Sequence, residues 1–384
     1  MRPINPKSVL SGAALLALAC GMPAAFAENG YGQHNLVSDI QGMADHTDAT
    51  LVNAWGLTRS STGPWWVNSN GKGLSIVYDG TGAPAPAASP IVVNVPPPPG
   101  GTGSSPTGIV FNGTPSFTLA SALPAVFIFA TEDGTISGWN RSVDPANAVI
   151  KVNNSPAAVY KGLTMGQMNG ALVLYAANFR GGTVDVFDTS FAPVTLDARA
   201  FQDPMIPAGF APFNVQSIGG SIFVTFAQQD DTKHDDVAGP GLGYVDQFTP
   251  EGVLVRRFEH GKWLNSPWGV ALAPAGFGKM SGRLLVGNFG SGQIASFDAQ
   301  SGEFQGLMRG ARGRPITIDG LWGLGFGNDG SAGAANVLFF AAGIQGESHG
   351  LFGTVTSTKV ERGNDNDDGQ GNQGQNSNGH SGKR

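Results

Sequence analysis

A short motif recurs six times along this chain at nearly constant spacing. Its copies are NAWGL, SPTGIVF, YKGLTM, APFNVQ, SPWGVAL and GLWGLGF. The aligned residues, separated by steps of 52, 54, 52, 55 and 54, are Gly56, Gly108, Gly162, Asn214, Gly269 and Gly323. Repeats of this length are supersecondary units that cannot bury their apolar faces alone and must stack on one another. The spacing therefore requires a fold of six similar, mutually packed units.

Each copy of the motif leads to two further apolar runs. In the fifth repeat these runs are LLVGNFGSG and QIASFDAQSG. Short runs rich in β-branched and aromatic residues, bounded by glycine, asparagine and aspartate, are typical of strands. Three such strands and a looser fourth in the connecting segment make one propeller blade. We predict an all-β chain folded as a six-bladed β-propeller over residues 28–360.

The two ends of the repeat array have to meet if the blades form a ring. The sixth repeat has no outer strand after Thr358, whereas the segment HNLVSDI, from His34 to Ile40, precedes the first motif and alternates as a strand does. An open ring would leave a sheet edge exposed. We expect the N-terminal strand to complete the sixth blade and close the propeller.

Composition agrees with this fold and excludes some functions. Glycine (58 residues) and proline (25 residues) are abundant, which disfavours long helices. The net charge of -6 argues against nucleic-acid binding, which needs a basic face to neutralise phosphates. After the N-terminal segment, no stretch approaches the ~18 consecutive apolar residues that a membrane-spanning helix needs. We expect a monomer without a membrane span.

The N-terminal segment has the pattern of a signal peptide. Arg2 and Lys7 precede the apolar run VLSGAALLALA, and Ala25-Phe26-Ala27 has the form of a cleavage site. Residues 1–27 are therefore predicted to be removed on export to the periplasm or the medium, leaving Glu28 as the first residue.

Two further features lie at the ends of the chain. Cys20 is the only cysteine, and lipidation there is the alternative to ordinary cleavage, although the preceding ALA is a poor match to a lipoprotein signal. Residues 361–384 contain no large apolar side chain, so we predict a disordered polar tail.

Several segments carry a resemblance to known propellers. SPWGVAL, LLVGNFGSG and QIASFD resemble NHL-type blades. LVNAWGL, IFATEDGTISGWN, YAANFRGGTVDVFD, KHDDVAGPG, NSPWGVALAPAGFG and HGLFG together resemble a family of uncharacterised exported bacterial proteins. This resemblance implies the fold and supplies no catalytic residues. Calcium-dependent lactonases and gluconolactonase-like hydrolases share the fold class more distantly, and a shared fold does not imply a shared function.

Polar residues occur just after the second strand of every repeat. They are Asn70, Glu132, Asn178, Gln228, Asn288 and Gln345. If their side chains face the central channel, they form a ring of oxygen donors that suits calcium. We single out Glu132, Asn178 and Asn288 as candidate ligands. The alternative is that these residues only make the turns between strands.

The fourth repeat has an insertion at the same turn, QQDDTKHDDVAGPGLG, from Gln228 to Gly243. Its candidate metal ligands are Asp230, His234, Asp235 and Asp236, which suit calcium, or zinc or manganese in a tighter geometry. The carboxylates could also act as general bases and raise the pKa of His234. Glu347 and His349 occupy the corresponding turn of the sixth repeat and could approach the same face. The alternative is a solvated acidic loop.

Aromatic side chains mark the motif itself. Trp55, Trp268 and Trp322 precede the glycine in three repeats, so three indoles near the axis could stack on a ligand, with Asn53 and Asn214 nearby. The alternative is packing between blades. His46 is a weaker candidate ligand because the neighbouring aspartates fit a capping or turn role.

Three functions remain open at this point. The sequence has no G-x-S-x-G, C-x-x-C, H-E-x-x-H or Walker motif, so nucleophilic serine or cysteine catalysis is unsupported. The first function is a binding module that uses one face of the disc for a small molecule, a carbohydrate or a protein. The second is a metal-dependent, calcium-type hydrolase of the lactonase or gluconolactonase class. The third is a structural protein of the cell envelope. Whether the protein is an enzyme stays open.

Overall fold

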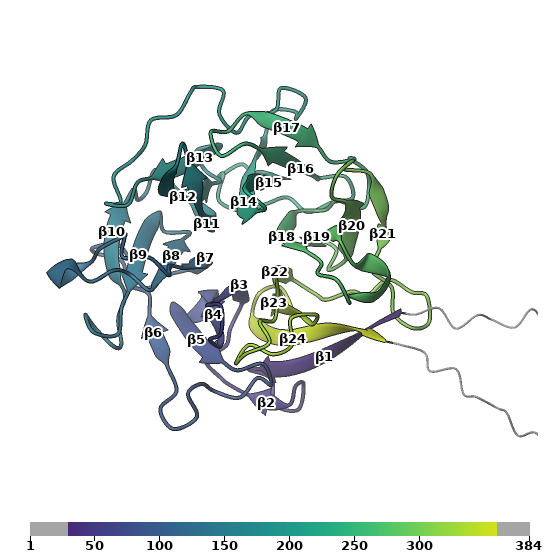
Figure 1. Ribbon diagram of the computed structural model, residues 1–384, viewed down its shortest axis with the longest axis horizontal. Helices are drawn as coiled ribbons and strands as arrows, with labels where there is room; N and C mark the ends of the chain where they lie inside the picture. Colours follow the sequence, from purple (N-terminus) through teal and green to yellow (C-terminus); the bar gives the residue numbers. More distant parts are fainter. Residues whose placement is uncertain (1–29, 359–384) are drawn as a thin grey trace, which may run out of the picture.

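The structure is a computed structural model that describes residues 30–358. Within this range six β-sheets stand like blades around one axis (Figure 1). The predicted six-bladed β-propeller is therefore confirmed. The predicted signal peptide, with Cys20, and the polar tail lie outside the described residues. No helix in the described part is both long and apolar enough to cross a membrane.

Blades one to three follow the chain outward from the axis. Blade one has β3 (Ala54–Arg59), β4 (Trp65–Ser69), β5 (Leu74–Tyr78) and β6 (Val92–Asn94). Blade two has β7 (Pro106–Phe111), β8 (Phe127–Thr131), β9 (Thr135–Trp139) and β10 (Val149–Asn153). Blade three has only β11 (Tyr160–Met168), β12 (Ala171–Asn178) and β13 (Thr183–Phe187), so the expected looser fourth strand is not formed there among the described residues.

Blades four to six complete the disc. Blade four has β14 (Phe210–Ile218), β15 (Ser221–Gln228), β16 (Gly243–Phe248) and β17 (Leu254–Arg257). Blade five has β18 (Pro267–Leu272), β19 (Arg283–Asn288), β20 (Ile294–Asp298) and β21 (Phe304–Leu307). Blade six has β22 (Leu321–Phe326), β23 (Leu338–Ile344) and β24 (His349–Thr358), followed outward by β1 (Gly30–Ser38) and β2 (His46–Thr47). Three short 3-10 helices lie in connections: η1 (Asn70–Lys72), η2 (Ala120–Ala122) and η3 (Gly278–Met280).

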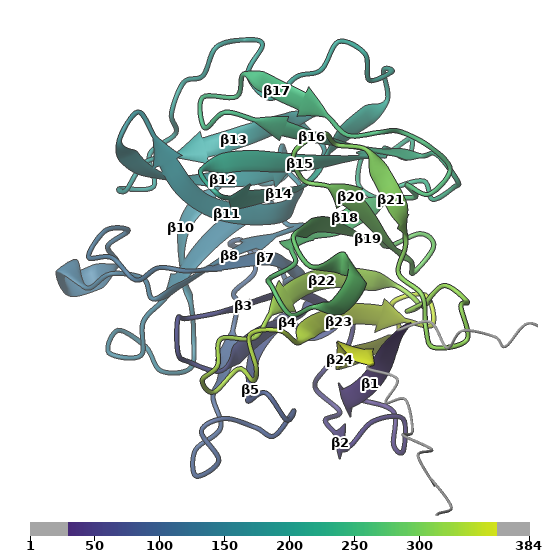
Figure 2. The same ribbon diagram turned by 45° about the vertical axis from the view of Figure 1, so that its right-hand side comes forward.

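The N-terminal strand closes the ring, as predicted. β1 runs antiparallel to β24, and Figures 1 and 2 both show the two strands side by side. Within the described residues the strand runs from Gly30, four residues before His34, to Ser38, two residues before Ile40. Its Tyr31 hydroxyl donates to the Phe277 carbonyl at 2.7 Å, which also ties it to blade five. Closure thus joins the first described residues to the last strand of the repeat array.

The hydrophobic core lies between the blades. Tyr175, Phe226 and Phe248 pack between blades three and four, and equivalent clusters fill the other interfaces. Each sheet is therefore apolar on both faces, which explains why the strands have few polar positions. Burial between neighbours, rather than within one blade, makes all six blades depend on one another.

Crowding at the axis explains the glycine of the repeated motif. A Cβ atom added to Gly56 would lie 2.1 Å from the carbonyl oxygen of Thr107 in the next blade. The same addition at Gly108 would meet the backbone nitrogen of Leu163 at 2.3 Å. Inner strands approach so closely here that a side chain has no room.

We predict that Gly56→Ala destabilises the protein by about 1–3 kcal/mol, because overpacking forces neighbouring backbone to move. Gly103→Ala is the matched control, since no atom lies within 4 Å of its added Cβ. Denaturant unfolding measures both free energies. Equal stability of the two variants would contradict the crowded axis.

Candidate functional site

One residue precedes each of the five motif glycines and Asn214, and all six of these residues lie on the inner strands of the blades. They are Trp55, Thr107, Lys161, Phe213, Trp268 and Trp322. All six are buried, with at most 5% of their surface exposed. Five of them are apolar or neutral, and Lys161 is the exception. The repeat has thus placed one charged side chain at a position where other blades carry aromatic or small residues.

The three tryptophans come together and fill the channel. Trp55 and Trp322 stack with ring centroids 3.6 Å apart, and Trp268 meets both of them edge-on at 6.3 and 6.0 Å. Phe289 stacks on the other face of the Trp322 ring at 3.9 Å. These ring faces are occupied by other rings, so the structure places the indoles as packing residues at the axis rather than as an open ligand platform.

Lys161 lies on β11 beside this aromatic cluster. Its ammonium nitrogen forms ion pairs with Glu132 and, at 3.0 Å, with Asp235, and it lies 5.2 Å from the centre of the Trp55 ring. Burial alone would lower the pKa of Lys161, but the two carboxylates outweigh burial and raise it. The lysine is therefore a fixed cation, and its nitrogen is not available as a neutral nucleophile.

Glu132 connects the lysine to a chain of polar side chains across the axis. The second oxygen of Glu132 accepts a hydrogen bond from the Asn70 side-chain amide at 2.9 Å. Asn53 donates to Asn70 at 3.2 Å and to Glu347 at 2.9 Å. Asn53 also accepts the indole N–H of Trp322 at 3.1 Å. Residues from blades one, two, three and six thus form one network over the aromatic cluster.

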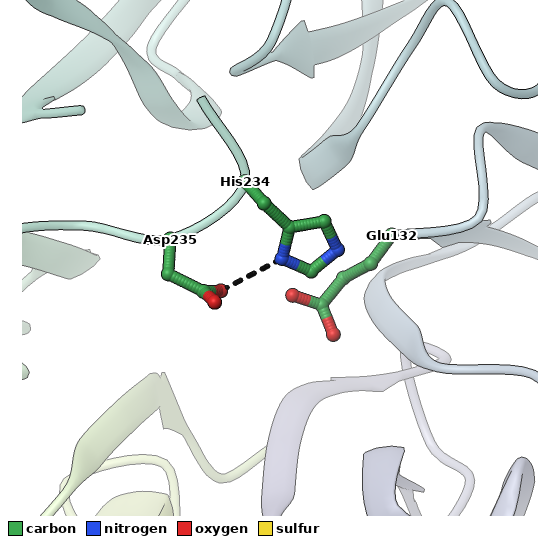
Figure 3. Close-up of side chains that lie close together, drawn as sticks. All are labelled: Glu132, His234 and Asp235. Carbon is green, nitrogen blue, oxygen red and sulfur yellow. Dashed lines mark hydrogen bonds and ion pairs between the residues drawn. The ribbon is translucent and has the colours of Figure 1, made fainter. Parts of the chain in front are cut away.

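Blade four completes the network with its inserted loop. Asp230 accepts backbone N–H groups of His234 at 2.9 Å and Asp235 at 3.3 Å, which folds the loop back on itself. In this folded-back conformation of the loop, His234 and Asp235 lie close to Glu132 (Figure 3). The insertion therefore leans inward and covers the end of the channel.

The loop residues influence one another's ionisation. His234 Nδ1 lies 3.0 Å from the carboxylate of Asp235. This hydrogen bond is the main cause that raises the pKa of His234, and it also lowers the pKa of Asp235. Burial raises the pKa of Glu347. The site thus combines an aspartate whose pKa is lowered, a histidine whose pKa is raised and a half-buried glutamate whose pKa is raised.

Three of the predicted metal ligands converge. Glu132, His234 and Asp235 each offer a ligand atom, and these atoms lie within 4.8 Å of one another. However, the Lys161 ammonium forms ion pairs with both carboxylates. A divalent cation would have to compete with this resident charge and would be repelled by it. The residues present therefore fit an ammonium ion rather than a metal ion.

The other predicted ligands have different partners. Asn178 accepts the backbone N–H of Gly181 at 3.0 Å, and Asn288 accepts that of Asn265 at 2.8 Å. Both asparagines thus serve backbone connections in their own blades instead of forming a common ring. The Asp230 carboxylate accepts hydrogen bonds that hold the inserted loop together. Burial raises the pKa of Asp236, which lies in the same loop. Asn214 donates to the Trp268 carbonyl at 2.8 Å, beneath the polar network.

The histidines proposed as additional ligands lie apart from the cluster. His349 Nδ1 pairs with Asp39 at 2.7 Å, at the junction of β24 and the N-terminal segment. His46 lies on β2, the outermost strand of blade six. In the turn of blade six, Glu347 is the described residue that joins the axial network, because it accepts a hydrogen bond from Asn53.

Lys161 was not among the residues predicted from the sequence, although a signal for it was present. Lys161 stands directly before the glycine of YKGLTM, where three other copies of the motif have tryptophan. A charged residue at a position that the fold buries requires a counter-charge nearby. That requirement could have linked Lys161 to Glu132 and to the acidic insertion.

The six blades and the charged cluster at their axis define the class: a closed six-bladed β-propeller with an ionic axial site. No family model matches the chain. It is 32% identical over 337 residues to the uncharacterized protein R648 of Acanthamoeba polyphaga mimivirus, covering 85% of this chain and 80% of R648. The uncharacterized protein L690 of the same virus is 31% identical and has 85% of its length covered. The chain belongs to the family of these proteins.

These relatives carry no stated activity, and they lend no support to the bacterial origin or the export that the sequence resemblance implied. Among solved structures, virginiamycin B lyase from Staphylococcus aureus aligns at 11% identity and a TM-score of 0.48, over 86% of this chain and all of the lyase. A protein of unknown function from Bacteroides thetaiotaomicron aligns at 10% identity and a TM-score of 0.49, over 85% of this chain and 76% of that one. Likenesses this distant transfer no residue roles.

We predict that Lys161→Met destabilises the protein by about 3–5 kcal/mol, because it leaves Glu132 as a buried charge without its counter-charge. The double variant Lys161→Met/Glu132→Gln should recover part of that loss, since the second substitution removes the stranded charge. Lys72→Met, at an exposed position, is the control. Denaturant unfolding of the four proteins tests the pairing. A double variant no more stable than Lys161→Met would contradict it.

Proposed function

We propose that this protein is a binding module that acts as a monomer and captures its ligand on the disc face that carries Asp235 and His234. The observation that carries this proposal is the Lys161 ammonium, held between Glu132 and Asp235 where a metal-dependent enzyme would need its ion. With the lysine charged, its nitrogen is not a free nucleophile, and Glu132 and Asp235 already hold a counter-charge where a metal ion would sit. It retains a set of fixed charges, which suits recognition.

The exposed carboxylate of Asp235 favours a cationic ligand at the outer side of the cluster. Lys161 and His234 both contact its Oδ1 atom, and no hydrogen bond within residues 30–358 engages its Oδ2 atom. The side chain of Asp235 is 65% exposed and that of His234 is 39% exposed, so a ligand can reach them from solvent. Carboxylates at such a mouth bind amines and guanidinium groups through charge-assisted hydrogen bonds. We propose a small molecule or a protein side chain that carries such a group.

Agmatine, which has both an amine and a guanidinium group, is a suitable probe. We predict that it shifts the NMR signals of the His234 ring in a saturable manner, and that Asp235→Asn weakens binding by about tenfold through loss of a charge-assisted hydrogen bond. Affinity should fall as the pH drops through the raised pKa of His234, because the protonated ring repels the cation.

Asp231→Asn, on the exposed part of the same loop, is the matched control for Asp235→Asn. Equal weakening by both variants, or tighter binding at low pH, would count against the proposed ligand site.

The alternative function is a metal-dependent hydrolase, favoured by the convergence of Glu132, His234 and Asp235 within 4.8 Å. We predict that the purified protein holds no stoichiometric metal ion and that a chelator leaves its melting temperature unchanged. Lys161→Ala should acquire affinity for Zn²⁺ or Ca²⁺, because it removes the competing cation from the same ligands. A tightly bound ion in the unaltered protein, with a lower melting temperature after chelation, would favour the hydrolase instead.

We also propose that the protein is exported. The support is the arrangement of Arg2, Lys7, the apolar run VLSGAALLALA and Ala25-Phe26-Ala27, all outside the described residues. Protein recovered from the periplasm or medium of an expressing bacterium should begin at Glu28. Recovery only of a chain that begins at Met1, from the cell interior, would contradict export.

A further inference from the structure

Blade three differs from the other five blades at its outer edge. In those blades an outer strand pairs with the third strand: β6, β10, β17, β21 or, in blade six, β1. Blade three ends at β13, which has no such partner strand among the described residues. The missing strand is a local departure from the repeat, so the segment that follows β13 needs an explanation.

That segment is held by blade four. After a turn, Val194 donates one backbone hydrogen bond to the Val186 carbonyl at 2.8 Å, and regular pairing stops there. Residues 195–207, which we call the strap, then cross to the next blade. The N–H of Phe201 donates to the Gly252 carbonyl at 2.8 Å, and Asp203 forms two hydrogen bonds of 2.6 and 2.7 Å with Arg257 on β17. These contacts draw the strap away from β13.

The outer edge of β13 is therefore left with free backbone groups. Alternate residues of an antiparallel strand direct their N–H and C=O groups to the same edge. Since the Val186 carbonyl faces the strap, Val184 directs its own N–H and C=O outward as well. Neither group has a backbone partner within residues 30–358. Because Val184 is only 4% exposed, an added strand would have to reach these backbone groups from within the groove beside β13 rather than from open solvent.

A cavity lies along this free edge. It has a volume of about 290 Å³, and its walls come from β13 on one side and the strap on the other. Val184, Val194 and Leu196 contribute apolar surface. The strap thus forms the far wall of a groove that runs beside unpaired backbone, which is the arrangement needed for strand addition.

The charge of the groove indicates which charge an added strand should carry. Its only charged lining residues are Asp185 and Asp197, both acidic. Asp185 accepts hydrogen bonds from Tyr160, Asn178 and Thr183, which are neutral donors. No cationic side chain pairs with either aspartate in the described part of the chain. We infer that the groove binds an extended basic segment of a partner protein, which adds to β13 as the fourth strand of blade three.

A second copy of this chain is a poorer occupant. It would bring a net charge of -6 and the same acidic edge. Like charges placed opposite one another across a strand pair are destabilising. Lysine or arginine side chains alternating with apolar ones would instead meet Asp185 and Asp197 while the backbone pairs with Val184.

The test uses an acetylated, amidated hexapeptide that alternates valine and lysine, fluorescently labelled, with the full-length protein. Binding should be saturable by fluorescence anisotropy, and hydrogen exchange of the Val184 amide should slow when the peptide binds. The same peptide with glutamate in place of lysine should not bind. A version with a central proline should bind about tenfold more weakly or less, because proline lacks the N–H that strand pairing needs.

Asp197→Asn should weaken binding of the valine–lysine peptide about threefold to tenfold, and added salt should reduce the difference. Its matched control is Asp298→Asn in blade five, where Asp298 likewise accepts a backbone hydrogen bond within its own turn, at 2.9 Å from Gln300. Absence of binding, equal binding of the glutamate peptide, or protection at another blade's edge instead of Val184 would overturn the inference. So would protection of Val184 by a dimer detected in sedimentation without peptide.

The readout at Val184 is separate from the shifts of the His234 ring that test the axial site. Failure of peptide binding with an intact response to agmatine would overturn only the strand-addition groove. The reverse result would overturn only the axial binding site.

Discussion

At the axis of the disc, six inner strands approach so closely that each motif glycine would bring a Cβ atom into contact with the next blade. This crowding decides what the neighbouring position can hold. Flat aromatic rings stack there, and they exclude solvent from the channel. A charged side chain in such a place is stable only with its counter-charges beside it. Lys161 meets that condition through Glu132 and Asp235, so the ionic site is a consequence of the crowded axis.

The pairing of Lys161 joins parts of the chain that are far apart in sequence. Glu132 comes from the end of the second strand of blade two, and Asp235 from the inserted loop of blade four. A buried ion pair adds little net stability compared with apolar packing, but losing one partner is costly. The lysine therefore restricts how the blade-four loop can fold, because a loop turned outward would leave the ammonium with one carboxylate fewer. The position of the blade-four loop, the charge of the surface around the axial site and the access of a ligand to that site all follow from this restriction.

Sequence alone predicted the parts of the fold that the repeat controls. The motif spacing identified six blades, and the sequence after Thr358, which lacks the pattern of a strand, identified the N-terminal segment as the closing strand. Sequence also selected Glu132, His234 and Asp235, which the structure brings together. It could not separate them from Asn178 and Asn288, because the same residue types make turns and bind ligands. Which way each side chain points depends on backbone partners that come from other segments.

The role of Lys161 and the missing strand of blade three could not be predicted from the repeat pattern, for a different reason. The importance of Lys161 becomes visible only when its position is recognised as buried. The missing strand of blade three depends on Asp203 and Arg257, whose pairing across two blades diverts the strap. Both features arise from contacts between neighbouring blades, whereas the repeat describes one blade at a time. Departures from the repeat, rather than the repeat itself, therefore mark the surfaces proposed for binding.

The most direct test of this account is the ionisation of Lys161, followed through its side-chain NMR signals as the pH is raised. A fixed ammonium held by Glu132 and Asp235 should stay protonated beyond the ordinary lysine pKa of 10.5. Glu132→Gln should lower that pKa, because it removes one of the two counter-charges while the burial remains. A Lys161 side chain that is already neutral near pH 7 would contradict the account, since the site would then hold a free amine.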